Sequence, residues 1–474
     1  MKFGSDLFGM RQPASPICHL LVALAVVTSI PTCASAQADS RNTYKNFSDA
    51  YASYTSAIES GDQSSALKAG RAAYDLGKAQ FGPVSPNAAA LAMNLGNLLV
   101  LSGTDDALAA RLFREADSIY EELNGAASAE RIEALLALAA IQETHDEKLE
   151  SIRALLAMHQ AVFPHDKLGF AALQTHCGQL LADARPGSLQ AQEILVEALD
   201  TLEAELGEDS PELIATLFAL GSAASAWEAP DRRQKGYFDR AVAIANQTPS
   251  FGPEAIADLQ TQIALKLVRQ RSGYREAMPY ARAALDTYNR LFGAPHPKTA
   301  FAMLTLGQAL IGTNDIPEGV ARIREAISFY ESSPEYAQSE LRARQVLMTV
   351  YMKEGNETRY DEQLMEVARL SEGSTTLDDY LPLVRAEPAY PMEAARDGIE
   401  GYVIVQYTVD ERGRTRDVVV LESGLKPGKR GKSNIFDEAA IRSAERYRYL
   451  PRFENGVPVS VPNVTTRIEF VMDD

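Results

Sequence analysis

The chain has 474 residues, of which 46% are hydrophobic and 23% charged, and its formal net charge is -18. This length predicts several domains or one extended array, because a single core rarely grows so large. The globular composition excludes wholesale disorder. Charges after Val384 nearly balance, so the acidity lies upstream. An acidic surface argues against a nucleic-acid partner, which needs a basic footprint, and like charge is enough to keep such a surface soluble.

Residues 1–36 have the layout of an export signal. A basic start at Lys2 precedes an apolar stretch that ends at Ile30, and small residues at 34–36 form a cleavage motif before Gln37. The apolar stretch has about 14 residues, whereas a membrane-spanning helix needs about 20. We therefore expect the leader to be removed and the remaining chain to be exported.

A retained membrane anchor is the alternative fate of the leader. Ser15 and His19 lie four residues apart at the start of the apolar stretch, on one face if it is helical. An ionisable residue inside a membrane helix is costly and usually functional. Pro16 interrupts this motif. From the sequence, both fates stay open, and contact with a membrane is expected only if the leader is kept.

The cysteines predict no internal disulfide in a processed chain. Cys18 and Cys33 lie in the leader, so its removal leaves one thiol, Cys177. Cys177 occupies an apolar helix position, as a small core residue does. Three histidines near it in sequence lack the paired short spacings of a structural zinc site: His159, His165 and His176. We expect no metal site, and the sequence indicates no cofactor.

Residues 42–372 contain an internal repeat with a period of about 42 residues. Each clear copy has a helix-ending Gly, a Ser-Pro or His-Pro pair, and a Leu-Gly pair inside the next helix. The clear copies begin at Gly82, Gly207 and Gly293, and weaker ones near Gly125, Pro164 and Gly252. Such self-similarity is typical of stacked helix pairs.

Each landmark of the repeat has a physical reason. We expect the first Gly to end a helix in the left-handed conformation. Ser85 and Ser210 are predicted N-caps, and the Pro after each suits a first helical turn. The second Gly, such as Gly96, lowers helix propensity, so we expect a neighbouring helix to pass too close for a side chain. Trp227 fits packing between repeats better than a ligand platform.

This pattern resembles the longer-period tetratricopeptide repeats of the kinesin-light-chain type. The resemblance implies an all-α superhelical array of about six to seven helix pairs with a concave binding face. Helices at 42–80 and 339–372 are expected to cap its ends. The resemblance is specific for fold and says little about function.

The pattern changes after Glu372. Residues 373–386 are a predicted linker, and residues 387–474 a predicted small α+β domain with an antiparallel sheet. The elements expected are a short helix from Pro391 to Asp397, strands at 402–409, 418–421 and 464–472, and a helix at 435–446 capped by Asn434.

Landmark residues of this region recur in the order of a known family. They are Tyr390-Pro391 with Ala394, Gly398, Glu400-Gly401, the strand Val403/Val405/Tyr407/Val409, Gly413, the strand Val418/Val420, Ser423, Phe436-Asp437 with Ala439-Ala440, Tyr447-Arg448-Tyr449, Pro451, Asn455-Gly456, Pro458-Val459 and Phe470. The domain thereby resembles the C-terminal domain of TonB-family energy transducers. None of these residues forms a catalytic constellation.

The resemblance implies a binding mode. TonB domains capture a short extended segment of an outer-membrane transporter by adding it as a strand to a sheet edge. The expected edge is the last strand, with Ile468, Phe470 and Met472 on one face and Arg467 and Glu469 on the other. The predicted partner-binding residues are Tyr390, Pro391, Val464, Thr465, Arg467, Ile468, Glu469 and Phe470. A role for these residues in the core alone stays open.

Two features depart from the family. The repeat array stands where transducers usually carry a Pro-rich linker. The loop from Lys426 to Lys432 is longer and more basic than the fold needs. It could contact acidic lipid or lipopolysaccharide phosphate, or be a solvated loop, and the sequence leaves these alternatives open.

The Ser15 and His19 spacing is similar to the one with which TonB anchors engage a motor of the ExbB–ExbD type.

The sequence therefore predicts a periplasmic TonB-like protein. We expect its terminal domain to bind TonB-dependent outer-membrane transporters or other envelope proteins, while the repeats hold a second, unknown partner. The alternatives are an energised transducer anchored in the inner membrane, and an envelope assembly scaffold that binds no transporter segment. The chain shows no nucleophile elbow, phosphate loop or paired motif carboxylates, so no enzymatic activity is expected.

Overall fold

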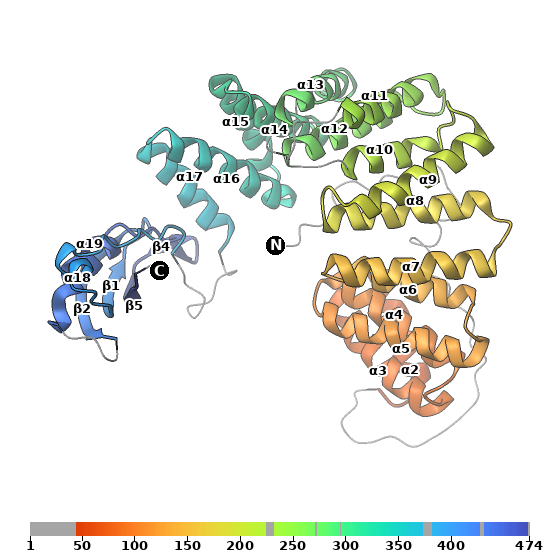
Figure 1. Ribbon diagram of the computed structural model, residues 1–474, viewed down its shortest axis with the longest axis horizontal. Helices are drawn as coiled ribbons and strands as arrows, with labels where there is room; N and C mark the ends of the chain where they lie inside the picture. The colour runs from red at the N-terminus through yellow and green to blue at the C-terminus, as the bar shows by residue number, and fades with distance from the viewer. Residues whose placement is uncertain are drawn as a thin grey trace. The chain divides into compact units, whose positions relative to one another are not determined.

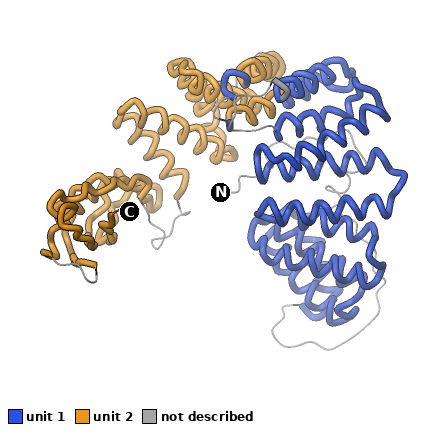
Figure 2. The backbone as a smooth tube through the Cα atoms, viewed as in Figure 1, with its two compact units in different colours: residues 1–259, 269–276 blue, residues 260–268, 277–474 orange. Residues whose placement is uncertain are grey.

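The structure is a computed structural model that describes residues 44–223, 232–270, 273–293, 295–372, 382–426 and 431–472. The chain divides into two compact units, residues 1–259 with 269–276 and residues 260–268 with 277–474, which Figure 2 colours separately. Several residues singled out in the sequence lie outside the described residues: Ser15, Cys18, His19, Cys33, Trp227 and most of the basic loop after Lys426.

Helices follow one another in pairs through the described part of the array (Figure 1). Their bounds are α2 (Phe47–Ser60), α3 (Gln63–Phe81), α4 (Pro86–Ser102), α5 (Asp106–Asn124), α6 (Ala129–Ile141), α7 (His145–Val162), α8 (Lys167–Ala184), α9 (Leu189–Leu206), α10 (Leu213–Ala223), α11 (Arg232–Gln247), α12 (Pro253–Val268), α13 (Tyr274–Leu291), α14 (Pro297–Gly312), α15 (Ile316–Glu331), α16 (Ala337–Lys353) and α17 (Glu357–Leu370). The predicted all-helical repeat array is confirmed, with α2–α3 and α16–α17 as its end pairs.

The first glycine of two clear repeats, Gly82 and Gly207, ends a helix, but not in the predicted conformation. Gly82 has φ 87° and ψ 154°, and Gly207 has φ 91° and ψ 160°. A positive φ combined with an extended ψ lies outside the left-handed helical region and is essentially restricted to glycine. The left-handed expectation was therefore wrong in ψ, and the requirement for glycine is stricter than predicted.

One of the two predicted serine caps is present. Ser85 Oγ accepts a hydrogen bond of 3.1 Å from the amide of Ala88, and Pro86 occupies the first turn of α4. Ser210 does not cap a helix, because α10 begins only at Leu213 and the Ser210 hydroxyl donates to the carboxylate of Glu212. Backbone hydrogen bonds close the turn before α10 instead, such as the one of 3.1 Å from the amide of Leu213 to the carbonyl of Ser210.

The second glycine of each repeat faces a large side chain. A Cβ built on Gly96 would lie 2.5 Å from the ring of Phe113, and one on Gly221 would lie 2.4 Å from Phe238. Both rings belong to the second helix of the same pair, so the predicted close approach of a neighbouring helix is confirmed. The same contact recurs between Gly178 and Leu195 and between Gly307 and Ile323.

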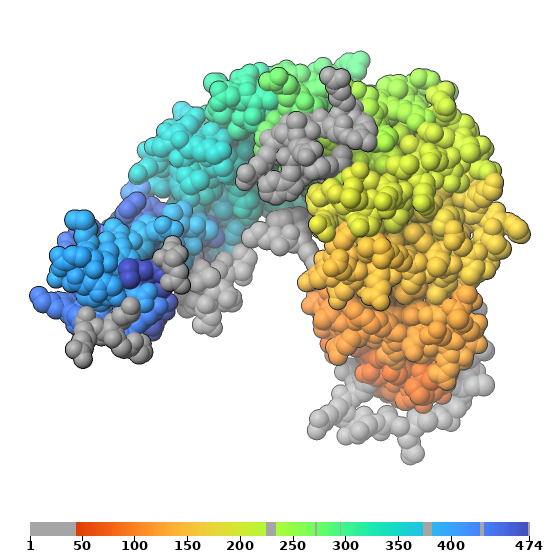
Figure 3. All heavy atoms as spheres, viewed as in Figure 1, coloured from red at the N-terminus to blue at the C-terminus, as the bar shows by residue number. Residues whose placement is uncertain are grey.

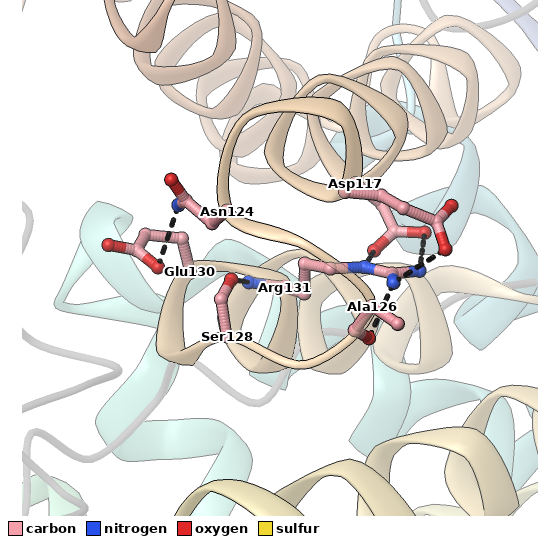
Figure 4. Close-up of polar contacts among 7 residues, drawn as sticks. Asp117, Asn124, Ala126, Ser128, Glu130 and Arg131 are labelled. Carbon is pink, nitrogen blue, oxygen red and sulfur yellow. Dashed lines mark hydrogen bonds and ion pairs between the residues drawn. The ribbon is translucent and has the colours of Figure 1, made fainter.

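A buried arginine secures the turn of the weaker repeat that contains α6, where the landmark proline is missing. Arg131 is 8% exposed, and its guanidinium donates to Asp117 at 2.8 Å, to Glu121 at 2.9 Å and to the carbonyl of Ala126 at 2.7 Å. Figure 4 shows the contacts with Asp117 and Ala126. Both carboxylates come from α5, so the buried charge is compensated by the helix on which α6 packs.

Apolar packing dominates the array. Consecutive segments of each unit lie against one another (Figure 3). In the first unit, one apolar cluster runs from Ile132 in α6 to Ala245 in α11. Ion pairs such as Lys78–Glu115, at 2.6 Å between α3 and α5, are about one-third exposed. Pairs with this exposure contribute little, so burial of the helix faces holds the stack together.

The second unit ends in a small α+β domain. Its elements are α18 (Met392–Arg396), β1 (Gly401–Val409), β2 (Thr415–Leu425), η2 (Ser433–Phe436), α19 (Asp437–Ala444), β3 (Arg452–Glu454), β4 (Val457–Val459) and β5 (Val461–Phe470). An antiparallel sheet has the order β2–β1–β5, and β3 and β4 form a separate hairpin. One face of β1 packs with residues of α18 and α19 in a single core. The predicted α+β class is confirmed.

Two boundaries of this domain differ from the prediction. Asn434 does not cap a helix with its side chain, because residues 433–436 form a 3-10 turn and α19 begins at Asp437. The last strand ends at Phe470, and Met472 lies beyond it with 37% of its surface exposed. Met472 is therefore no part of the strand face that it was expected to share with Ile468 and Phe470.

The hairpin of β3 and β4 was not predicted as strands. Each strand has three residues, too few for an alternating pattern to show. Their turn is formed by Asn455 and Gly456, which both have positive φ (54° and 75°). Two successive positive φ values match the twist of a two-residue hairpin, for which Asn-Gly is the preferred sequence.

Candidate functional site

β5 is an edge strand. It pairs antiparallel with β1, from Gly401 opposite Phe470 to Val409 opposite Val461. In the part of the chain that the structure describes, β5 has no partner strand on its other side. Alternate amides and carbonyls of an edge strand point away from the sheet and are available to a further strand. The edge predicted from the sequence is therefore geometrically open to strand addition.

The side chains of β5 divide between two faces. Ile468 and Phe470 are 5% and 1% exposed and belong to the core, against which Val464 packs half-buried. Thr465, Arg467 and Glu469 are exposed on the opposite face. The inward residues therefore fix the strand, and the outward ones are in reach of an added strand.

The regular part of the edge begins at Val464. The register with β1 shifts between the pairs Tyr407–Val464 and Val409–Val461. Within this irregularity, Asn463 has φ 61°, and Pro462 has no amide hydrogen to donate. The continuous hydrogen-bonding edge therefore comprises Val464 to Phe470.

Tyr390 lies at the far end of β5. Its ring meets Phe436 and Phe470 edge-on, with centroids 5.7 and 5.9 Å away, and its hydroxyl donates to the carbonyl of Ile399 at 2.7 Å. Burial, followed by the charge of Glu400, raises the pKa of this phenol. Tyr390, and with it Pro391 at the start of α18, is thus brought to the end of the predicted edge.

A polar cluster that the sequence did not single out crosses the open face of the sheet. The guanidinium of Arg467 stacks on the Tyr402 ring with 3.8 Å to its centroid, and the Tyr402 hydroxyl donates to Glu422 at 2.5 Å. This hydrogen bond to a carboxylate raises the pKa of Tyr402. Side chains alternate along β1, so Tyr402 and the buried Val403 lie on opposite faces of the sheet. This alternation could have assigned Tyr402 to the open face from the sequence.

Buried tyrosines hold β5 from beneath. The Tyr407 hydroxyl lies 2.6 Å from the Tyr449 hydroxyl and 2.9 Å from Thr466 Oγ1. Burial is the main cause that raises the pKa of Tyr407. A hydrogen-bonded hydroxyl network in a core fixes the position of the strand that it contacts. These hydroxyl contacts therefore hold β5 against the core on the side of Thr466.

Other classes of site find little support among the described residues. None of their helices combines the length and apolar character needed to cross a bilayer. No group of three or more His, Cys, Asp or Glu side chains within them is placed to hold a metal ion. Cys177 is fully buried, which raises the pKa of its thiol to about 12. Such a thiol is unreactive at neutral pH.

Over the described residues, the geometry defines a helical-repeat protein whose last domain presents a strand with one edge unpaired. Comparison with known proteins identifies both parts. Residues 386–472 match the model of the family described as Gram-negative bacterial TonB protein C-terminal, and residues 266–298 match a tetratricopeptide repeat model. Both resemblances drawn from the sequence are thereby confirmed.

The terminal domain is similar to the protein TonB of Pseudomonas aeruginosa. The two are 36% identical over 89 residues, which cover 19% of this chain and 24% of that protein. The chain thus spans about a quarter of the length of this curated relative. The match is confined to the terminal domain and does not extend to the array.

The solved structures that match this chain share little sequence with it. BtubC from P. vanneervenii has a TM-score of 0.36 and 16% identity, and covers 56% of this chain and 98% of its own. The assembly chaperone of RpL4 has a TM-score of 0.31 and 18% identity, and covers 65% and 99%. Likeness at this level carries no weight for function.

Proposed function

We propose that the protein is a periplasm-facing, TonB-like binding protein. Its terminal domain takes up a short extended segment of an outer-membrane transporter, or of another envelope protein, as an additional strand beside β5. Its array holds a second protein partner. The proposal assigns no chemical step to the chain, which acts by binding.

The open edge of β5 is the observation that carries this proposal. Strand addition requires a regular, unpaired edge whose side chains on one face are accessible. Val464 to Phe470 meet this requirement, because Ile468 and Phe470 are anchored in the core while Thr465, Arg467 and Glu469 remain exposed. The similarity to the TonB C-terminal family over residues 386–472 supports the same mode.

The array supports the second half of the proposal. Stacked helix pairs present an extended surface, and helical repeats of this kind commonly bind proteins. The chain has an array where a transducer needs only a spacer, so we infer that the repeats contribute a binding site of their own. Competition tests this inference in the whole chain: a partner that the chain captures should be retained when a β5-directed peptide saturates the terminal domain.

A second candidate function is that of an energised transducer in the inner membrane. The observation that favours it is the spacing of Ser15 and His19 in the apolar leader. Intact mass of the protein from membrane and soluble fractions distinguishes the two. A chain that begins near Gln37 and is soluble supports the periplasmic protein, whereas one that retains residues 1–36 in the inner membrane supports motor contact.

Disulfide crosslinking tests the strand-addition proposal. A peptide with the sequence of a TonB-dependent transporter's extended segment carries one cysteine, and the full chain carries Arg467→Cys on β5. Facing residues of paired strands place Cβ atoms about 4.5–5.5 Å apart, close enough for a disulfide. The matched control is Leu421→Cys, 54% exposed on the opposite edge strand β2. Native Cys177 is buried and does not form a crosslink. Cys18 and Cys33 are replaced by serine.

We expect a crosslink through position 467 and none through position 421. Equal yields at both positions, or a crosslink only at 421, would overturn the assignment to β5. No crosslink at either position, with both variants folded by circular dichroism, would favour the remaining alternative, an assembly scaffold that binds no transporter segment.

A further inference from the structure

The last helix of the array contacts the terminal domain within the second unit. The guanidinium of Arg414, in the turn that joins β1 to β2, donates to the carboxylate of Asp361 in α17. The same nitrogen lies 4.0 Å from Glu357, one turn earlier on the helix. The side chain of Asp361 is 19% exposed and that of Arg414 35%. Ion pairs this far removed from solvent are screened less than fully exposed ones.

A second contact joins the same two parts at another point. The carboxylate of Glu372, just after α17, accepts a hydrogen bond from the amide of Gly456 at 3.2 Å, and its other oxygen lies 3.3 Å from this amide. Gly456 belongs to the turn between β3 and β4. Hydrogen bonds in which a carboxylate accepts are stronger than neutral ones. Two separate turns of the domain are thus held by acidic residues of the array.

The charges on the two sides are complementary. α17 carries two arginines, Arg359 and Arg369, and four acidic residues, which leave it with a net negative charge: Glu357, Asp361, Glu362 and Glu366. Arg414 of the domain forms an ion pair with Asp361 of this helix. The charge of Arg448, also in the domain, acts on Tyr360 of α17. Burial, followed by the charge of Asp361, raises the pKa of Tyr360, whereas Arg448 opposes the rise. Tyr360 is therefore subject both to the negative charge of Asp361 on its own helix and to the positive charge of Arg448 in the domain.

We propose that the acidic face of α17 is a docking surface whose partner is this chain's own terminal domain, held through Asp361 to Arg414 and Glu372 to Gly456. The domain is then fixed to the array and does not move as a free tethered module. A partner bound to the nearby repeats is kept at a defined position relative to the β5 edge.

The docking leaves the candidate edge uncovered. Arg414 precedes Thr415, which pairs with Val409, and Val409 also faces Val461 at the start of β5. Phe470, at the other end of β5, pairs with Gly401. The helix therefore meets the end of the sheet that lies away from Tyr390 and Phe470. Docking does not depend on strand addition, and either can be wrong without the other.

Distance measurement between two spin labels tests the docking in the full chain. One label is placed at Ser332, an exposed site after α15, and the other at Glu438 in α19, whose side chain is 82% exposed. Cys18 and Cys33 are replaced by serine, and buried Cys177 does not react. Docking predicts one narrow distance distribution for the parent chain, and a broad one after Asp361→Arg.

Charge exchange distinguishes the ion pair from other effects. Combining Asp361→Arg with Arg414→Asp should restore the narrow distribution. Glu362→Arg makes the same change on the same helix at an exposed position and should leave the distribution narrow. Arg414→Gln removes the contact without altering α17, so a folding defect of the helix cannot account for its broad distribution. About 1 M salt, where the Debye length is about 3 Å, should broaden the parent distribution.

A broad distribution in the parent chain would overturn the proposal. So would a narrow distribution with an unchanged mean distance in both Asp361→Arg and Arg414→Gln. Strand addition is read out separately, by the crosslink at position 467, so the failure of one proposal leaves the other intact.

Discussion

The guanidinium carbon of Arg467 lies 3.8 Å from the centre of the Tyr402 ring, across the boundary between β5 and β1. Arg467 Nε also lies 3.2 Å from a carboxylate oxygen of Glu469. Stacking and ion pairing together hold one cation and one anion in fixed positions along the outer face of β5. The order of charges along an added strand should therefore affect its affinity.

A peptide residue that faces Arg467 should preferably be acidic. Cross-strand charge pairs contribute roughly 0.2–1 kcal/mol, which corresponds to a preference of up to about fivefold for Glu over Lys at that position. Arg467→Glu should invert the preference. Fluorescence anisotropy titration of two labelled peptides that differ only at this position measures it. Arg442→Glu makes the same charge change on α19, away from the edge, and should leave the preference intact. An unchanged preference in Arg467→Glu would contradict the assignment.

Strand pairing at β5 should stop at Asn463. The positive φ of Asn463 bends the backbone out of register, and Pro462 offers no amide. Lengthening a peptide should raise its affinity until it spans Val464 to Phe470, about seven residues, and no further. Calorimetric titration of peptides extended stepwise at either end measures this limit. A steady gain from residues placed beyond Asn463 would show that the irregularity does not end the edge.

The helix-ending glycines should be intolerant of alanine although space surrounds them. A Cβ on Gly207 would meet no atom within 4 Å, yet its φ of 91° with ψ 160° is strained for any other residue. Gly207→Ala should lower the free energy of unfolding by roughly 1–3 kcal/mol. Gly236, exposed inside α11 with equally open surroundings, is the matched control. Gly236→Ala should stabilise by about 0.5–1 kcal/mol. Urea unfolding gives both values, and equal effects would refute the conformational argument.

The sequence predicted the array because its landmarks are local and recur. Gly96 could be assigned to a close helix contact from its spacing alone, and the ring of Phe113 supplies that contact. The conformation of Gly82 could not be predicted, because a glycine before a cap fits several backbone regions equally well. The cap predicted at Ser210 was wrong because its Ser-Pro pair matches the one that caps α4, whereas α10 begins only at Leu213.

The candidate edge was predictable from strand alternation, and its surroundings were less so. Ile468 and Phe470 face the core, as their period of two indicates. The stacking of Arg467 on Tyr402 joins residues 65 positions apart, and no local pattern reports such a pair. The same holds for Asp361 and Arg414, which lie 53 residues apart in two differently patterned parts of the chain.

Acid should destabilise the array through His176. Burial lowers the pKa of His176 below the ordinary value of 6.5, and the charge of Lys148 lowers it further. The unfolded chain therefore takes up a proton at a higher pH than the folded one does. The contribution of neutral His176 to stability is fully present above about pH 6.5 and is lost as the pH falls towards the folded-state pKa. Burial also lowers the pKa of His159, and the charge of Asp166 opposes this change.

Thermal unfolding followed by far-ultraviolet circular dichroism tests this pH dependence. The midpoint temperature of unfolding of the wild-type chain should decrease as the pH is lowered from about 7.5 to about 5. An unperturbed histidine becomes charged in this interval. His176→Gln should have a flatter profile, because no proton is gained at that position on unfolding. His165→Gln, at an exposed position between α7 and α8, should keep the wild-type profile. Parallel profiles for the wild type and His176→Gln would show that the acid sensitivity lies elsewhere.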